Sequence, residues 1–166
     1  MPRDDLTQDE IKSLLSYDPE SGLFVWKKSY HTSRIGQIAG HVDGEGYIRI
    51  GISAKAYVAH RLAWVYMTGR WPEAEIDHIN AVKADNRWAN LREASRWENS
   101  GNTPTAKNNS SGFKGIYWHS GRQKWYAAIR YYKKKIHLGS FDTVQDAANA
   151  YAKASHELYG RFARTE

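Results

Sequence analysis

The chain has 166 residues, of which 41% are hydrophobic and 25% are charged, a composition that allows one domain or two small ones with real cores. No run of about 18 apolar residues occurs, which excludes a transmembrane helix. The opening decapeptide is too acidic and polar for a signal peptide. Because the chain lacks cysteine, disulfides and thiolate zinc sites are excluded, and an intracellular protein is expected.

The net charge of +6 is distributed unevenly along the chain. Residues 1–100 carry 13 Lys and Arg against 14 Asp and Glu, whereas residues 101–166 carry 11 against 4. Eight basic residues and no acidic one lie between Gly101 and Phe141, interleaved with aromatic residues. This asymmetry indicates a polyanionic partner that is bound mainly by the C-terminal part. A solvated basic surface is the ordinary alternative.

The N-terminal part is predicted to be a small sheet with two helices. Thr7 and Glu10 have the spacing of a capping box for the first helix. Gly69 is expected to end the second helix, and Pro72 prevents its resumption. The helices are expected over residues 6–16 and 60–68, and the extended segments over residues 23–26, 37–40, 46–50 and 56–59.

The segment 75–102, EIDHINAVKADNRWANLREASRWENSGN, carries the residues with the clearest chemistry. We expect a strand ending in Asp77 and His78, an Asn-rich connection, a short extended piece from Asn90, and the first turn of a helix that contains Asn99. This order would bring the four side chains together. A carboxylate and an amide oxygen are hard ligands that suit hydrated Mg²⁺ or Mn²⁺. A neutral imidazole beside them can take a proton from an attacking water near neutral pH.

These residues resemble the HNH endonucleases, in particular the phage-type homing endonucleases with a DHIN…NN…NLR…EN pattern. The likeness extends upstream to residues 59–63, AHRLA. It implies a ββα-metal nuclease motif in which Asp77 and Asn99 are the metal ligands and His78 is the general base. Asn90 then corresponds to the middle asparagine of the catalytic motif, which holds the shape of the loop. The implied cofactor is a divalent metal, Mg²⁺ or else Mn²⁺.

An ordinary structural explanation exists for each member of this set. Most Asp-His pairs are surface or hydrogen-bonded structural groups, and Asn90 and Asn99 have the residue type that is favoured at caps and turns. The spacing of all four residues together favours the nuclease interpretation over the structural one.

The C-terminal part is predicted to be a three-stranded antiparallel sheet packed on one helix. Residues 102–111, NTPTAKNNSS, read as a linker. Strands are expected over residues 113–119, 124–132 and 135–140, and a helix between Thr143 and Gly160. Strand alternation with the helix on one face leaves the other face basic and aromatic. A three-stranded sheet of this kind can lie in the major groove of DNA, which is about 12 Å wide.

This second segment resembles the AP2 (ERF-type) DNA-binding domain, most clearly in the AAIR string and in LGSFDTVQDAA. The resemblance implies a DNA-facing set. Its members are Lys114, Tyr117, His119, Arg122, Arg130, Lys135 and His137. Because several arginines of the plant pattern are replaced here, by Tyr117 and His119 among others, the base preference of the plant proteins is not expected to transfer.

Together these features predict an α+β protein with an HNH nuclease domain at residues 1–101, a linker at 102–111 and an AP2-like domain at 112–166. The expected function is metal-dependent hydrolysis of phosphodiester bonds in double-stranded DNA by a homing-type endonuclease of a phage or prophage. A non-catalytic DNA-binding regulator with a degenerate motif is the alternative, and a structure- or RNA-directed nuclease is a third. The sequence predicts neither the target site nor whether one or both strands are cut. It is compatible with a monomer or a homodimer.

Overall fold

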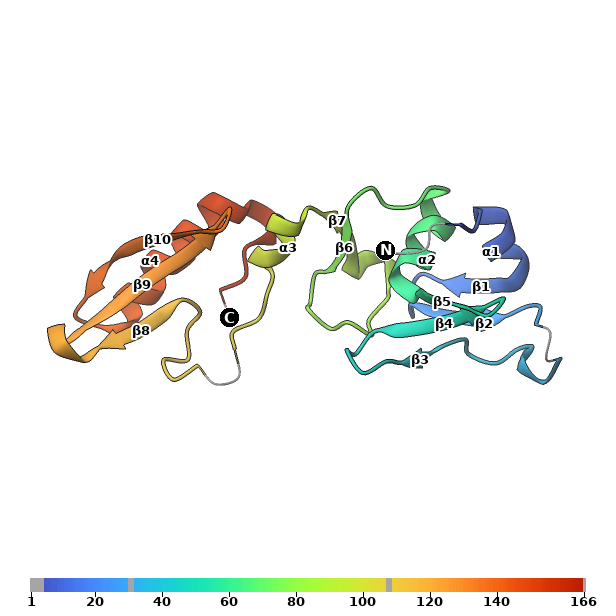
Figure 1. Ribbon diagram of the computed structural model, residues 1–166, viewed down its shortest axis with the longest axis horizontal. Coiled ribbons are helices and arrows are strands. Elements are labelled where there is room, and N and C mark those ends of the chain that lie inside the picture. The colour runs from blue at the N-terminus through green and yellow to red at the C-terminus, as the bar shows by residue number, and fades with distance from the viewer. Residues whose placement is uncertain (1–4, 30–31, 107–108, 166) are drawn as a thin grey trace. The chain divides into compact units, whose positions relative to one another are not determined.

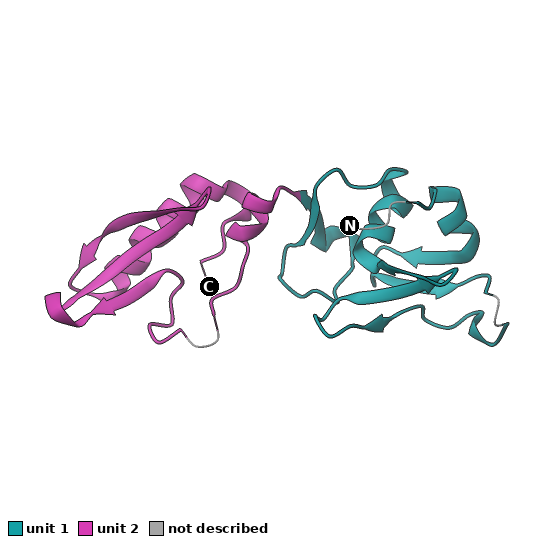
Figure 2. Cartoon of the chain, viewed as in Figure 1, with its two compact units in different colours: residues 1–93 teal, residues 94–166 magenta. Residues whose placement is uncertain are grey.

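The structure is a computed structural model and describes residues 5–29, 32–106 and 109–165. It divides into two compact units, residues 1–93 and 94–166, and each is described by itself (Figure 2). Both units contain helices and β-sheet, so the predicted α+β class is confirmed. No helix in the described part of the chain is long and apolar enough to cross a membrane.

The described residues of unit 1 form three small sheets and two α-helices. The first sheet is a hairpin, the second has the order β3-β4-β5, and the third pairs β6 with β7 (Figure 1). The elements are α1 (Gln8–Leu14), β1 (Leu15–Asp18), β2 (Leu23–Trp26), η1 (Thr32–Arg34), β3 (His41–Val42), β4 (Ile48–Ile52), β5 (Lys55–Val58), α2 (Ala59–Thr68), β6 (Glu75–His78), η2 (Trp88–Asn90) and β7 (Leu91–Ala94).

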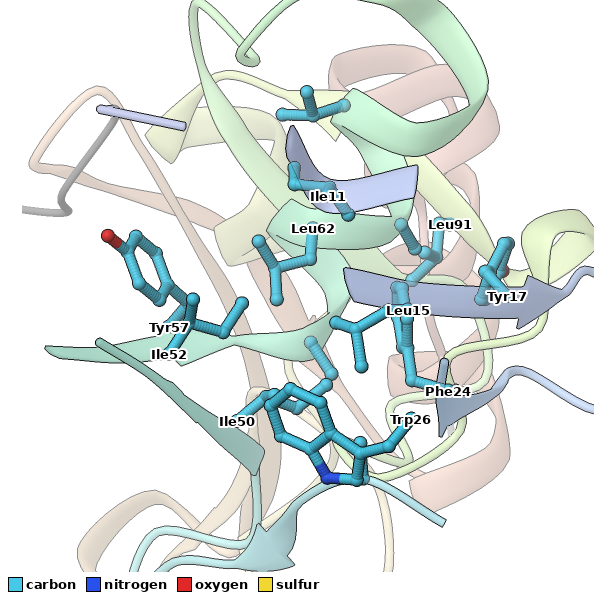
Figure 3. Packing of buried hydrophobic residues seen from close by; sticks show 14 of the residues in the cluster. Ile11, Leu15, Tyr17, Phe24, Trp26, Ile50, Ile52, Tyr57, Leu62 and Leu91 are labelled. Carbon is cyan, nitrogen blue, oxygen red and sulfur yellow. The ribbon is translucent and has the colours of Figure 1, made fainter. Parts of the chain in front are cut away.

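The core of unit 1 forms where α1 and α2 pack with the strands. Ile11, Leu15, Ile50 and Leu62 are completely buried there, and Phe24 is nearly so (Figure 3). Burial of side chains of this size stabilises a fold by about 1.5–3 kcal/mol each. This core fixes α2 and thereby the side chains that α2 presents to β6.

Two predicted helix caps are present, at the N-terminus of α1 and at the C-terminus of α2. The Thr7 hydroxyl accepts a hydrogen bond from the Glu10 amide, and the Glu10 carboxylate accepts one from the Thr7 amide, which confirms the capping box. Gly69 ends α2 in the left-handed conformation at φ +79°, as expected of a C-terminal glycine.

Unit 2 is a three-stranded antiparallel sheet with the order β10-β9-β8 and α4 against one face (Figure 1). The core of unit 2 contains Ile116, Ala127, Ile129, Ala147 and Tyr151. The predicted sheet-and-helix arrangement is therefore confirmed. The elements are α3 (Arg96–Gly101), β8 (Ile116–His119), η3 (Ser120–Arg122), β9 (Lys124–Tyr131), β10 (Lys134–Phe141), α4 (Val144–Tyr159) and η4 (Gly160–Phe162).

The structure departs from the predicted elements in several places. The first helix ends at Leu14 rather than at residue 16, because Leu15 begins the hairpin strand β1. No strand covers residues 37–40: Ile38 forms a single bridge with Val25, and the strand itself is β3, one residue further on. A register shift between His137 and Gly139 in β10 was also not predicted.

The compact units and the predicted domains divide the chain at different places. The structure divides it after residue 93, whereas the sequence suggests a nuclease domain that ends at residue 101. Helix α3 is part of unit 2, although the nuclease motif includes it. The assignment of residues 1–101, 102–111 and 112–166 as functional domains therefore stays a prediction.

Candidate functional site

The carboxylate of Asp77 is held at the end of β6 by an arginine from the neighbouring strand. Asp77 is 4% exposed, and its Oδ2 accepts hydrogen bonds from Arg92 Nε at 2.8 Å and from the Arg92 terminal nitrogen at 2.7 Å. A charge-assisted pair of this kind fixes both the position and the orientation of the carboxylate. Asp77 is thus a buried carboxylate whose orientation is fixed by Arg92.

His78 is buried next to Asp77, and its protonation pattern follows from its hydrogen bond. His78 Nε2 lies 3.3 Å from Asn86 Oδ1, and Asn86 Nδ2 donates to the Ala84 carbonyl at 3.3 Å. Because the amide nitrogen of Asn86 is used there, its oxygen faces the ring, and Nε2 is the nitrogen that donates. The lone pair of the neutral ring is therefore on Nδ1. Burial lowers the pKa of His78, which keeps the imidazole neutral at pH 7.

A second histidine packs edge-on against the first. The ring centroids of His60, from α2, and His78 are 5.0 Å apart with an interplanar angle of 84°. The Tyr47 ring contacts both imidazoles, with its centroid 5.4 Å from that of His60 and 6.1 Å from that of His78. His60 is 8% exposed, and its Nδ1 has no hydrogen-bond partner within the described residues. Burial lowers the pKa of His60 to about 3, so this ring is neutral as well.

Asn90 connects the two sides of the loop that follows β6. Its Oδ1 accepts a hydrogen bond from the Asn80 amide at 3.0 Å. Its Nδ2 donates to Asn80 Oδ1 at 3.0 Å and to the Asp85 carbonyl at 2.8 Å. These bonds satisfy a buried amide and fix the shape of residues 80–85. The geometry suits the loop-holding part that the resemblance implies, and the catalytic assignment of Asn90 stays a prediction.

Asn99 lies on α3, in the other compact unit. Its backbone amide donates to the Ser95 carbonyl at 2.9 Å, and Ser95 and Glu98 form a capping box that defines the start of this helix. Because Asp77 is in unit 1 and Asn99 in unit 2, their joint binding of a metal stays a prediction. No group of three or more His, Cys, Asp or Glu residues that could hold a metal occurs in the described ranges.

Hydrated Mg²⁺ does not require such a group, because it usually keeps several waters and binds one or two protein oxygens. The oriented Asp77 carboxylate next to a neutral imidazole fits that requirement. The residues at the end of β6 are therefore compatible with the metal that the motif implies.

The open face of the unit 2 sheet carries the predicted aromatic layer. In the strand register, Tyr117 lies opposite Tyr126 and His137 opposite Ala128, so these residues share one face. The Tyr126 ring is at the centre of the layer, 5.7 Å from Tyr117, 5.0 Å from His119 and 5.0 Å from His137. Tyr126 is therefore only 8% exposed although it faces away from the helix.

The predicted basic residues fall into two groups. Three belong to the aromatic face: Arg122 donates to the Tyr126 hydroxyl at 2.9 Å, Lys135 Nζ lies 5.0 Å from the Tyr117 ring centroid, and Arg130 is opposite Lys135 in the register. Lys114 differs. Its ammonium donates to the backbone carbonyls of residues 101 and 103 at 2.9 and 2.6 Å, and burial lowers its pKa to about 8. The DNA-binding role of all seven predicted residues stays a prediction.

Four residues that the sequence analysis did not assign contact the predicted site residues. Arg92 belongs to the NLR string and His60 to the upstream segment AHRLA, but neither motif indicates what the side chain contacts. Asn86 belongs to the Asn-rich connection. Tyr126 lies in the segment 124–132 that was predicted to be a strand, and its central place in the aromatic layer follows only from the strand register.

Comparison with known proteins gives a match to the HNH endonuclease family model at residues 57–100. Protein 3.8 of Escherichia phage T7 is 35% identical over 111 residues, which cover 66% of this chain and 91% of that protein. No solved structure matches the chain. The family model ends before residue 112, so the likeness of the last segment to an AP2 domain stays a prediction. The chain belongs to the same family as the phage T7 protein 3.8, and its residues 57–100 carry an HNH endonuclease-like domain.

Proposed function

We propose that this protein is a metal-dependent DNA endonuclease of the homing type that hydrolyses phosphodiester bonds in double-stranded DNA. The observation that carries the proposal is the pair at the end of β6, where an oriented carboxylate, Asp77, adjoins a buried neutral imidazole, His78. The match to the HNH endonuclease family at residues 57–100 supports it.

In this proposal His78 is the general base. Its Nδ1 accepts a proton from the attacking water, while Asn86 keeps the other ring proton on Nε2. His60 packs edge-on against the ring, and Tyr47 contacts it at a tilted angle, so both keep the ring in place. Correct placement of a base of this type contributes about 10²–10⁴-fold to a rate.

Asp77 and Asn99 are the proposed metal ligands, with Mg²⁺ as the preferred ion and Mn²⁺ as the substitute. When bound, the metal supplies stabilisation of the charge that develops on the phosphate and on the leaving 3′ oxygen. Arg92 holds the Asp77 carboxylate in position and orients it for that role. Asn90 maintains the loop between the two halves of the motif. The products are 5′-phosphate and 3′-hydroxyl ends.

Unit 2 is the proposed DNA-locating part. Arg122, Arg130 and Lys135 lie on one open sheet face together with Tyr117, His119 and His137. Cations on such a face contact phosphates, so the affinity for DNA should fall steeply with salt concentration. Lys114 is included as a phosphate contact at the edge of this face. The setting is the cytoplasm of a bacterial host, and the chain acts as a monomer or a homodimer.

A second candidate function is a non-catalytic DNA-binding regulator. The observation that favours it is the ion pair between Asp77 and Arg92, because a carboxylate already neutralised by an arginine has less need of a metal. The two functions predict different outcomes with DNA and metal.

Incubation of the full chain with phage and host genomic DNA in the presence of Mg²⁺ tests the proposal. Cleavage that is prevented by EDTA, with fragment ends that map to defined sites and carry 5′-phosphates, is the expected result. Binding to DNA without metal-dependent cleavage would instead support the regulator. Competition with RNA distinguishes the third class, because an RNA-directed nuclease would lose DNA cleavage to an RNA competitor.

A further inference from the structure

A cleft of about 540 Å³ lies within unit 2 at the start of β8. It is lined by the end of α3 and the segment that follows it, by the first residues of β8, and by residues of β9, β10 and α4. Sites for small molecules and cofactors typically measure about 300–1,000 Å³. The cleft is therefore larger than a single phosphate needs and has room for a whole nucleotide.

The charge lining the cleft is entirely positive. Lys114, Arg130 and Lys135 line it, and none of the lining residues is acidic. Arg130 and Lys135 are directly opposite each other in the register of β9 and β10, so both side chains project on the same face. Across the described ranges, neither has a carboxylate partner. A cleft of this composition attracts an anion.

Among the residues that line the cleft, Lys114 is the best placed to donate a hydrogen bond to an anionic ligand. Its ammonium group donates to two backbone carbonyls, of Gly101 and Thr103, and an ammonium has three donors. The two carbonyls fix the nitrogen in the wall of the cleft and leave its third donor for a ligand. The side chain is thus preorganised, so little conformational entropy is lost when it binds.

An aromatic ring completes the site. Tyr117 lines the cleft, is 40% exposed, and has Lys135 Nζ at 5.0 Å from its ring centroid. Exposed aromatic rings beside cations are the surfaces on which unpaired bases stack in proteins that bind single strands. A base inside a duplex is paired and stacked and is not available to enter a cleft of this size, so the occupant must be an unpaired nucleotide.

We propose that this cleft is a nucleotide site, in which Lys114, Arg130 and Lys135 bind one phosphate and the sugar and base lie beside Tyr117. The nucleotide belongs to an unpaired stretch of a DNA strand, such as a displaced or overhanging end. That the strand is DNA rests on the proposed function, whereas the presence of a phosphate-binding cleft does not. The substrate class is accordingly DNA with a non-duplex segment next to the duplex that the sheet face binds.

The test is a titration of the full ¹⁵N-labelled chain, followed by NMR in EDTA, with deoxythymidine 5′-monophosphate, inorganic phosphate and thymidine in separate arms. The nucleotide is expected to shift the amides of Gly115 and Tyr117 and to bind more tightly than either fragment. Lys135→Met is expected to weaken nucleotide binding about tenfold, as loss of a hydrogen bond to a charged group does. Lys133→Met removes the same charge from the exposed turn between β9 and β10 and should leave the affinity within about twofold.

Two further measurements cover the cases in which a lysine variant misfolds or a free nucleotide is the true ligand. Thr103→Phe places a large ring at an exposed position of the lining without altering charge, and it is expected to abolish the shifts at Gly115. A single-stranded oligothymidylate should shift the same amides at lower concentration than the mononucleotide.

Equal binding by the Lys135→Met and Lys133→Met variants would overturn the proposal, as would shifts spread over basic residues outside the cleft. Equal affinity for thymidine and the monophosphate would overturn the phosphate assignment. Tighter binding of the mononucleotide than of the oligonucleotide would overturn the assignment to a DNA strand. None of these readouts uses cleavage, so a cleft that binds nucleotides in a protein that cuts no DNA would leave this inference standing and remove the proposed nuclease function.

Discussion

Replacing His60 by phenylalanine should make the protein more resistant to acid. In the folded state burial lowers the pKa of His60 to about 3, whereas in the unfolded chain the imidazole titrates near 6.5. Between these pH values the unfolded chain binds a proton that the folded chain does not, so the free energy of unfolding falls as the pH falls below 6.5. Each pH unit in this window costs about 1.4 kcal/mol, which gives about 2 kcal/mol at pH 5. Phenylalanine keeps the ring contacts with Tyr47 and His78 and removes the titration.

Urea unfolding at pH 7 and pH 5 measures this effect. The natural chain should lose about 2 kcal/mol more than His60→Phe between the two pH values, since His78 and the other titrating groups are common to both proteins. A matched control is His156→Phe, which replaces an exposed histidine of α4 and should leave the pH dependence unchanged. An identical loss of stability in the natural chain and in His60→Phe would refute the reasoning, because it would show that His60 is not a buried neutral group.

Three other substitutions test the site and the sheet. Arg92→Leu leaves the Asp77 carboxylate buried without its arginine and should lower the free energy of unfolding by about 3 kcal/mol; a change below about 1 kcal/mol in urea unfolding would contradict the ion pair. Asn90→Ala removes three hydrogen bonds from the loop 80–85 and should cost about 2 kcal/mol, with faster hydrogen exchange of the loop amides. Gly115→Ala should disorder unit 2, seen as loss of its NMR dispersion, because φ is +71° and the new Cβ would meet a β9 carbonyl and an α4 ring at 2.4 Å.

Local sequence patterns predicted much of the fold because local chemistry determines those elements. The apolar spacing of Leu62 and Val65 and the glycine at position 69 define α2, and alternation along 124–131 defines β9. The open face of unit 2 was predicted because successive side chains of a strand point to opposite faces of the sheet. The register shift after His137 was not predicted, since it depends on how β10 meets β9 rather than on β10 alone.

The contacts of the site depended on tertiary structure and could not be predicted. The spacing of Asp77 and Arg92, fifteen residues apart, does not show that two short strands bring them together. Lys114 was expected on the open face, but the positive φ of Gly115 turns the chain there, and the ammonium bonds two backbone carbonyls. His60 shows no signal of its own, because its place against His78 depends on how α2 packs on the core.

In the proposed mechanism His78 removes a proton from water at a phosphate held beside Asp77. Cleavage of a mapped DNA substrate in Mg²⁺ by the natural chain and by His78→Ala, with binding of the same DNA measured in EDTA, tests this role of His78. We expect a loss of at least about 10²-fold in the cleavage rate and an unchanged binding affinity. Undiminished cleavage by the variant, or a parallel loss of cleavage and binding, would contradict the account.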